Sequence, residues 1–161
     1  ALAEAEPACS GPAAAAVLAA DLLRRAAALT GLGMSCLVSA VRRTRGRQQF
    51  GRALADNQSV GFRLAGLAVH GRAVRALCGQ LAGAAELDHR AAAGALAEAA
   101  AFATASAADA VQLHGAFGMV ANSPVAGHYR FAPLAIARSP APDALRRHVG
   151  GTHPISRALA G

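Results

Sequence analysis

The sequence contains no lysine and no tryptophan, and aromatic residues make up only 4% of its 161 positions. Its net charge of +7 therefore comes from arginine alone. Basic segments that bind nucleic acid often interleave arginine with aromatic side chains, and no such segment is present; helix-turn-helix and zinc-ligand patterns are missing too. The composition thus argues against nucleic-acid binding. A smaller phosphorylated molecule is the better match for the arginines.

Cysteine is also scarce. Cys9, Cys36 and Cys78 are odd in number and widely spaced, which predicts reduced thiols in a cytoplasmic protein. No apolar stretch reaches about 20 residues without a charge or a glycine, so we expect no membrane span. The first residues, with Glu4 and Glu6 but no basic segment, do not resemble a signal peptide. The six histidines lack the paired spacing of metal ligands, and we expect no metal site.

Small and aliphatic side chains dominate the sequence instead. Hydrophobic residues make up 54% of the chain, a composition typical of helical bundles with close helix contacts. Apolar residues recur every three or four positions over about 12–45, 60–81 and 92–113, which predicts three long helices. We therefore predict an all-α, up-down helical bundle of three long helices and a shorter fourth. This bundle would span residues 12–161, after a linker or flexible arm at 1–11.

Individual residues refine this prediction. Asp56 or Asn57 can cap the second helix, and Glu86 and Asp88 mark its end and the start of the third. Gly31 and Gly33 would each destabilise a helix interior by up to about 1 kcal/mol, so we expect a neighbouring helix to pack closely against both. Prolines near the end of the chain predict repeated helix interruptions, at Pro133, Pro140 and Pro142.

Two polar breaks in the helical pattern carry a distinctive order of residues. Residues 45–51 read Arg-Gly-Arg-Gln-Gln-Phe-Gly, and Gln58 follows at the start of the second helix. Residues 109–118 read Asp-Ala-Val-Gln-Leu-His-Gly-Ala-Phe-Gly and end the third helix with two glycines. In this order and at this spacing, the segments resemble the C-terminal helical domain of the acyl-CoA dehydrogenase flavoprotein family. The segment 124–130 resembles that family as well.

The resemblance implies an FAD cofactor held between the subunits of an oligomer. The residues that would meet the flavin nucleotide of a neighbouring protomer are Arg47, Gln49 and Phe50. The residues that would line its adenosine and pyrophosphate portion are Gln58, Gln112, Gly115 and Ala116. These residue types suit the role, because a guanidinium can fork onto phosphate oxygens and glycine lets backbone N–H groups approach an anion. Ala116 stands where the family usually has a second glycine.

The reaction of the family, α,β-dehydrogenation of an acyl-CoA thioester, requires a carboxylate base beside the flavin. Many members carry a glutamate after the Tyr-Arg pair of this last segment, here Tyr129-Arg130, and that glutamate has no counterpart in this sequence. Other members place the base on the first long helix, and Asp21 occupies the corresponding position. Asp21 is therefore the candidate base, and a solvated carboxylate on a helix surface is the alternative. Asp143 is a second candidate, which would otherwise serve as an N-cap.

The resemblance thus implies a C-terminal domain, or a half-size subunit, of an FAD-dependent acyl-CoA dehydrogenase-like oxidoreductase. We expect a homo- or hetero-oligomer with a chain of the same family, which would supply the missing domains and, if needed, the base. A catalytically inactive interaction module derived from the family is the alternative. A third possibility is an anion-binding helical protein that contacts nucleic acid. That possibility requires one continuous basic face made of Arg24, Arg42, Arg43, Arg72, Arg75, Arg146 and Arg147.

Overall fold

The structure is a computed structural model that describes residues 11–120, 122–137 and 145–147. Its three long helices are α1 (Pro12–Gly46), α2 (Gln58–Ala82) and α3 (His89–His114). A hairpin of β1 (Gln48–Gln49) and β2 (Arg52–Ala53) and the 3-10 turn η1 (Leu54–Asp56) connect α1 to α2. The shorter helices α4 (Ala116–Met119) and α5 (Pro124–Ala137) follow α3. Residues 1–10 of the predicted arm lie outside the described residues, as do Pro140, Pro142 and Asp143.

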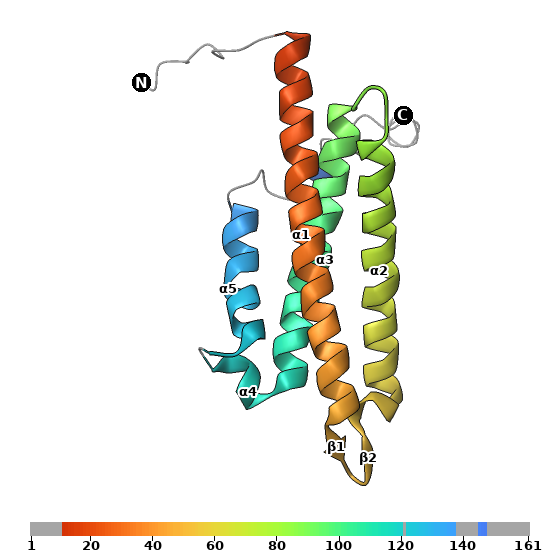
Figure 1. Cartoon of the computed structure of the whole chain (residues 1–161), viewed down its shortest axis with the longest axis vertical. Coiled ribbons are helices and arrows are strands. Elements are labelled where there is room, and N and C mark those ends of the chain that lie inside the picture. The colour runs from red at the N-terminus through yellow and green to blue at the C-terminus, as the bar shows by residue number, and fades with distance from the viewer. Residues whose placement is uncertain (1–10, 121, 138–144, 148–161) are drawn as a thin grey trace, which may run out of the picture.

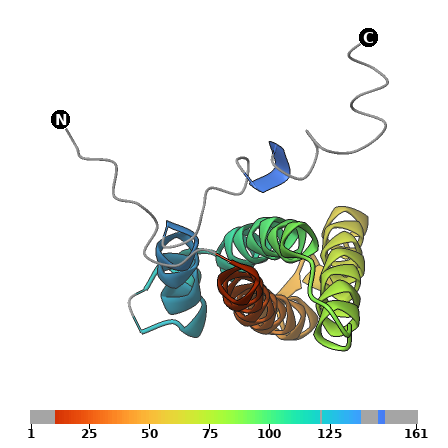
Figure 2. The same ribbon diagram turned by 90° about the horizontal axis from the view of Figure 1, so that it is seen from above.

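The three long helices run alternately up and down, and α3 lies along α1 for much of its length (Figure 1). Seen along the bundle, α1 and α3 form the middle, with α2 on one side and α5 on the other (Figure 2). The predicted all-α, up-down bundle with a shorter fourth helix is therefore confirmed.

The core is built on α3, whose small residues form a buried face. Phe102 is the largest fully buried side chain, and it lies between Gly33 of α1 and Gly71 of α2. A Cβ atom built on Gly33 would lie 2.6 Å from the Phe102 ring, and one built on Gly71 would lie 2.5 Å from it. Both glycines thus make room for the ring. The small residues of the α3 face with no exposed surface include Ala92, Ala99, Ala103, Ser106 and Ala110.

Polar side chains define where the second and third helices begin. Asn57 caps α2, because its Oδ1 accepts a hydrogen bond from the Ser59 N–H at 3.1 Å. Asp88 caps α3 by accepting from the backbone N–H groups of Arg90 and Ala91. Each cap satisfies donors that would otherwise be left without a partner in the first turn.

Three expectations about single residues differ from the structure. Gly31 is exposed on α1, where a Cβ atom would meet nothing within 4 Å, so its predicted close packing is wrong while that of Gly33 is confirmed. Leu18, one of the apolar residues whose spacing predicts a buried face on the first helix, is 49% exposed, because α1 extends past the other helices at this end (Figure 1). Pro133 lies inside α5 and does not end it. Pro133 has no backbone N–H, so the Tyr129 carbonyl four residues earlier receives no helical hydrogen bond from it. Tyr129 is half-exposed, and water can donate to this carbonyl instead.

By length and composition, α3 would also be able to cross a membrane, with a mean hydropathy of 1.3 over its most apolar window. In this structure 61% of that window is buried inside the bundle. The apolar character of α3 is accounted for by its place in the core.

Candidate functional site

Seven of the eight predicted site residues lie at one end of the bundle, which we call the hairpin end. It comprises the end of α1, the β1–β2 hairpin, the start of α2, the end of α3 and α4 (Figure 1). The up-down order of the helices brings these segments together although more than fifty positions separate Phe50 from Gln112 in the sequence. The residues concerned are Arg47, Gln49, Phe50, Gln58, Gln112, Gly115 and Ala116.

The hairpin presents Phe50 at its tip. Gln49 pairs with Arg52, so the turn consists of Phe50 and Gly51 alone. Both turn residues have positive φ, 55° for Phe50 and 77° for Gly51, as in a type I′ turn. A bulky side chain is disfavoured in this conformation, and Phe50 is also 100% exposed. Strain and full exposure of an aromatic side chain together indicate a contact surface.

Arg47 and Gly115 approach each other across the end of the bundle. Arg47 follows the last turn of α1, where its N–H donates to the Arg43 carbonyl at 3.0 Å, and its own carbonyl accepts from the Leu54 N–H at 2.8 Å. Gly115 ends α3 with φ 65°. A Cβ atom built on Gly115 would lie 3.8 Å from Arg47 Nη1. The structure thus brings a guanidinium beside a backbone position that only glycine adopts easily.

The turn after α3 is held in place by close packing. A Cβ atom on Gly118 would lie 2.6 Å from the Val111 carbonyl oxygen and 2.9 Å from the His114 Cβ, so the fourth residue of this turn must be glycine. The buried His114 ring lies 2.7 Å, through Nδ1, from the Ala110 carbonyl, to which it donates, and its Nε2 lies 3.4 Å from Ser39 Oγ on α1. The glycine-rich turn is therefore fixed to both α1 and α3.

The hairpin end carries a strong positive charge. Residues 42–58 contain five arginines and one acidic residue, Asp56. Arg43 stacks over the Phe117 ring with its guanidinium carbon 5.9 Å from the ring centroid, and its Nε is buried without a hydrogen-bond partner in the described part of the chain. An anionic ligand would be attracted to this end of the molecule.

The polar candidates of the hairpin end are open to solvent. Gln49, Gln58, Gln112 and Ala116 are exposed, while Arg47 is half-buried. Their side chains make no mutual contacts that would use up the amide donors and acceptors. The surface can therefore take a ligand or a second protein chain, and that these residues converge on one ligand stays a prediction.

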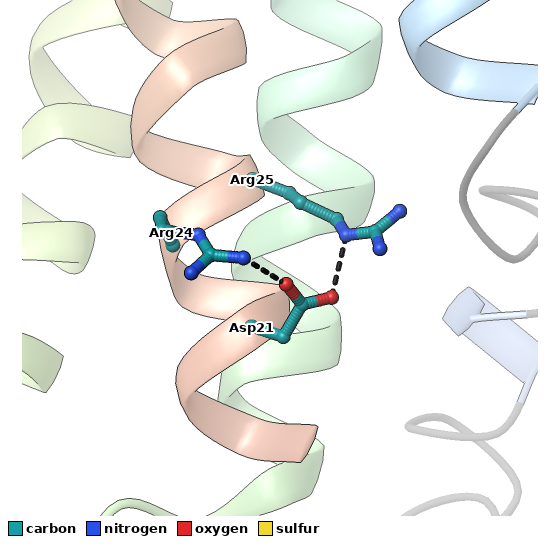
Figure 3. A network of polar contacts seen from close by, with 3 residues as sticks. All are labelled: Asp21, Arg24 and Arg25. Atoms are coloured by element: carbon teal, nitrogen blue, oxygen red, sulfur yellow. Dashed lines mark hydrogen bonds and ion pairs between the residues drawn. The ribbon is translucent and has the colours of Figure 1, made fainter. Parts of the chain in front are cut away.

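Asp21, the candidate base, lies elsewhere. It is 25 residues before Gly46 on the same helix, so about 37 Å separates it from the hairpin end. Its two carboxylate oxygens each accept from a guanidinium: Oδ1 from Arg24 Nη2 at 2.5 Å and Oδ2 from Arg25 Nε at 2.6 Å (Figure 3). In one chain, Asp21 and the hairpin end cannot contact the same flavin ring.

One ion pair at the hairpin end was not predicted from the sequence. Asp109 is buried on α3 and accepts from Arg63 on α2, with Arg63 Nε 2.6 Å from Asp109 Oδ2 and a second contact between Arg63 Nη2 and Oδ1. This bidentate pair fixes α2 to the end of α3. The sequence contains one signal of this pair, a carboxylate within the apolar pattern of the third helix. Its partner Arg63 lies 46 positions away and is recognised only in the structure.

Comparison with known proteins identifies the fold. A family profile described as the C-terminal domain of acyl-CoA dehydrogenase matches residues 13–136. The chain belongs to the acyl-CoA dehydrogenase family. This confirms the resemblance predicted from the two polar breaks. A search of curated protein sequences found no match.

Solved structures of acyl-CoA dehydrogenases agree with this assignment. Butyryl-CoA dehydrogenase from Megasphaera elsdenii is 28% identical with a TM-score of 0.79, and the match covers 86% of this chain and 37% of that one. A putative acyl-CoA dehydrogenase from Mycobacterium smegmatis is 29% identical with a TM-score of 0.76, at the same coverages. An acyl-CoA dehydrogenase from Geobacillus kaustophilus, 21% identical, shares the fold with a TM-score of 0.71 over 82% of this chain and 36% of its own. The chain thus spans less than two fifths of the length of these relatives.

Proposed function

We propose that this acyl-CoA dehydrogenase-family chain supplies FAD-binding and subunit-contact surface to an oxidoreductase that dehydrogenates an acyl-CoA thioester. The observation that carries the proposal is the approach of Arg47 to Gly115 at the hairpin end. These two residues come from the two separate motifs of the sequence, and they lie side by side at an exposed, positively charged surface.

The residues present fit the cofactor. The pyrophosphate of FAD is an anion that a guanidinium can bind through two parallel hydrogen bonds. Arg47 offers such a group next to Gly115, whose positive φ and missing side chain leave the backbone open to close approach. Gln58 and Gln112 are exposed amides that can donate to and accept from the adenosine portion. Ala116 is exposed, so its methyl group does not fill the turn.

FAD, when bound, supplies the hydride acceptor for the oxidation. The residues of this chain would hold and orient the nucleotide, with Arg47 on phosphate oxygens and Phe50 against the neighbouring subunit. The Phe50 ring is fully exposed and does not pack against the bundle of its own chain, which supports a site shared with a neighbouring subunit. The family's remaining domains would come from the rest of the polypeptide or from a partner chain, in a homo- or hetero-oligomer.

Asp21 stays the predicted base for the reaction. It would serve a different flavin from the one that contacts the hairpin end of the same chain. One observation favours the alternative, a catalytically inactive interaction module: both oxygens of Asp21 are already bonded to guanidinium groups. The nucleic-acid alternative is weakened because Arg43 stacks on Phe117 and Arg146 pairs with Glu98.

A titration of FAD against the protein, followed by quenching of flavin fluorescence, tests the proposed site. We expect Arg47→Ala to weaken binding about tenfold or more, because a charge-assisted hydrogen bond to phosphate is lost. Arg72→Ala removes the same charge from the exposed surface of α2 and should have little effect. Equal losses of FAD affinity in the two variants would show that only the overall charge of the protein matters. That result would contradict a specific FAD site at Arg47.

A further inference from the structure

We propose that Arg43 is a positioning residue for the FAD site and that it acts through the ring of Phe117. The inference rests on the proposed function, and it concerns an arginine that precedes the first polar motif, residues 45–51. Arg43 lies in the last turn of α1, four residues before Arg47. Its backbone contacts one part of the proposed site, and its side chain contacts another.

The backbone of Arg43 fixes the start of the segment that carries Arg47. The Arg43 carbonyl accepts a hydrogen bond from the Arg47 N–H at 3.0 Å, and this bond closes the helix. Arg47 itself is extended, with φ −93° and ψ 123°, so the chain leaves the helix axis at this point. Any residue at position 43 would supply the same carbonyl. The need for an arginine must therefore come from its side chain.

The side chain of Arg43 contacts the turn that carries Gly115. Its guanidinium carbon lies 5.9 Å from the centroid of the Phe117 ring, within the range of a cation–π contact. The Gly118 N–H donates to the Gly115 carbonyl at 2.8 Å, so the ring and Gly115 belong to the same tight turn. A shift of the ring would therefore move the backbone that lies beside Arg47.

The ring is the contact that holds the guanidinium of Arg43. The Arg43 Nε is buried without a hydrogen-bond partner, and Arg43 forms no ion pair with a carboxylate of the described residues. Asp109, at the same end of the bundle, is bonded to Arg63 instead. A cation–π contact strengthens when part of the cation is removed from water. The guanidinium in turn holds Phe117, whose surface is 55% exposed.

Hydrogen exchange of the full chain without FAD tests the contact itself. Arg43→Leu and Phe117→Leu should each speed the exchange of the Gly118 and Val120 N–H groups, which are bonded within the turn, about threefold to tenfold. Arg42→Leu removes the same charge from the neighbouring, exposed position and should leave these rates unchanged. Unchanged exchange of the turn in both the Arg43 and the Phe117 variant would overturn the proposal, whether or not the protein binds FAD.

Titration of FAD against the same variants tests the effect on the site. Arg43→Leu should weaken FAD binding about threefold to tenfold, and adding Phe117→Leu should cause little further loss, because both residues act through one contact. Additive losses in the double variant would overturn the proposal. Phe117→Tyr keeps the ring and should lose less affinity than Phe117→Leu. Circular dichroism of each variant checks that it is folded.

The conservative substitution separates positioning from charge. Arg43→Lys keeps the positive charge but loses the planar group that stacks on the ring, so it should restore only part of the FAD affinity. Full recovery in Arg43→Lys would show that charge alone matters and would overturn the proposal. A wild-type chain that binds no FAD, but whose turn still exchanges faster in Arg43→Leu, would contradict the proposed function while supporting Arg43 as the residue that positions this turn.

Discussion

Replacing Gly71 by alanine should destabilise the bundle, although alanine is the better helix former. The Cβ atom at position 71 would lie 2.5 Å from Phe102 Cζ and 2.9 Å from Met34 Sδ, whereas ordinary carbon contacts exceed about 3.4 Å. The ring would have to retreat by about 1 Å. It cannot do so freely, because Gly33 of α1 is packed against another edge of the same ring, at Cε1 and Cδ1.

The expected loss of unfolding free energy is about 1–3 kcal/mol, the usual penalty for overpacking a core. Gly66→Ala is the matched control on the same helix, since Gly66 is exposed and a Cβ there meets nothing within 4 Å. That variant should gain about 0.5–1 kcal/mol, because alanine loses less backbone entropy than glycine. The two substitutions are chemically identical, so only the surroundings of the two positions can make their effects opposite in sign.

Urea unfolding followed by circular dichroism measures both values. Phe102→Leu in the Gly71→Ala background provides a further check. It removes part of the ring that the new methyl meets, so the two changes together should cost less than the sum of the single changes. Stabilisation of the protein by Gly71→Ala, to the same degree as by Gly66→Ala, would refute the packing of Phe102 between α1 and α2.

Three other changes test different parts of the structure. Arg63→Ala should reduce the unfolding free energy by about 1–3 kcal/mol, because it leaves the buried Asp109 carboxylate without its partner; a change below about 0.5 kcal/mol would contradict the pair. Burial raises the pKa of Cys36 to about 11, so the folded thiol keeps its proton above pH 9 while the unfolded one loses it. Stability should then fall between about pH 9 and 11 by up to about 1.4 kcal/mol per pH unit, and Cys36→Ala should flatten this decline in urea unfolding at successive pH values. Phe50→Asn should raise the melting temperature of the isolated chain, since asparagine suits a type I′ turn, and should weaken its association in analytical ultracentrifugation; a melting temperature that falls would show that Phe50 is not strained.

Much of the fold could be predicted from the sequence because its signals are local. The spacing of apolar residues defines the three long helices, and Asn57 and Asp88 define where two of them begin. Phe102 also lies in this pattern, but its place between two glycines depends on three helices at once. Gly31 and Gly33 illustrate the limit: the sequence cannot tell which of two nearby glycines faces a neighbour, because that depends on the rotation of α1 in the bundle.

In the candidate site, too, local motifs could be predicted from the sequence while contacts between helices could not. The order of the two polar motifs was enough to predict the family, and the up-down order of the helices explains why both motifs reach one end of the bundle. The Arg63–Asp109 pair joins positions 46 residues apart on different helices, so no local pattern reveals it. The role of Asp21 depends on the side chains around it, and the sequence spacing did not distinguish a free base from a carboxylate held by two arginines.

The visible absorbance spectrum of the purified protein, alone and after co-expression with the adjacent reading frame, tests whether this chain contributes to an FAD site. We expect flavin absorption bands and one FAD per site in at least one preparation, and we expect their loss in Arg47→Ala but not in Arg72→Ala. If flavin is present, Asp21→Asn then tests the base, since a catalytic carboxylate would abolish flavin bleaching by acyl-CoA while leaving the bound FAD in place. A protein that is colourless in both preparations would contradict the flavoprotein assignment and leave the bundle as an interaction module.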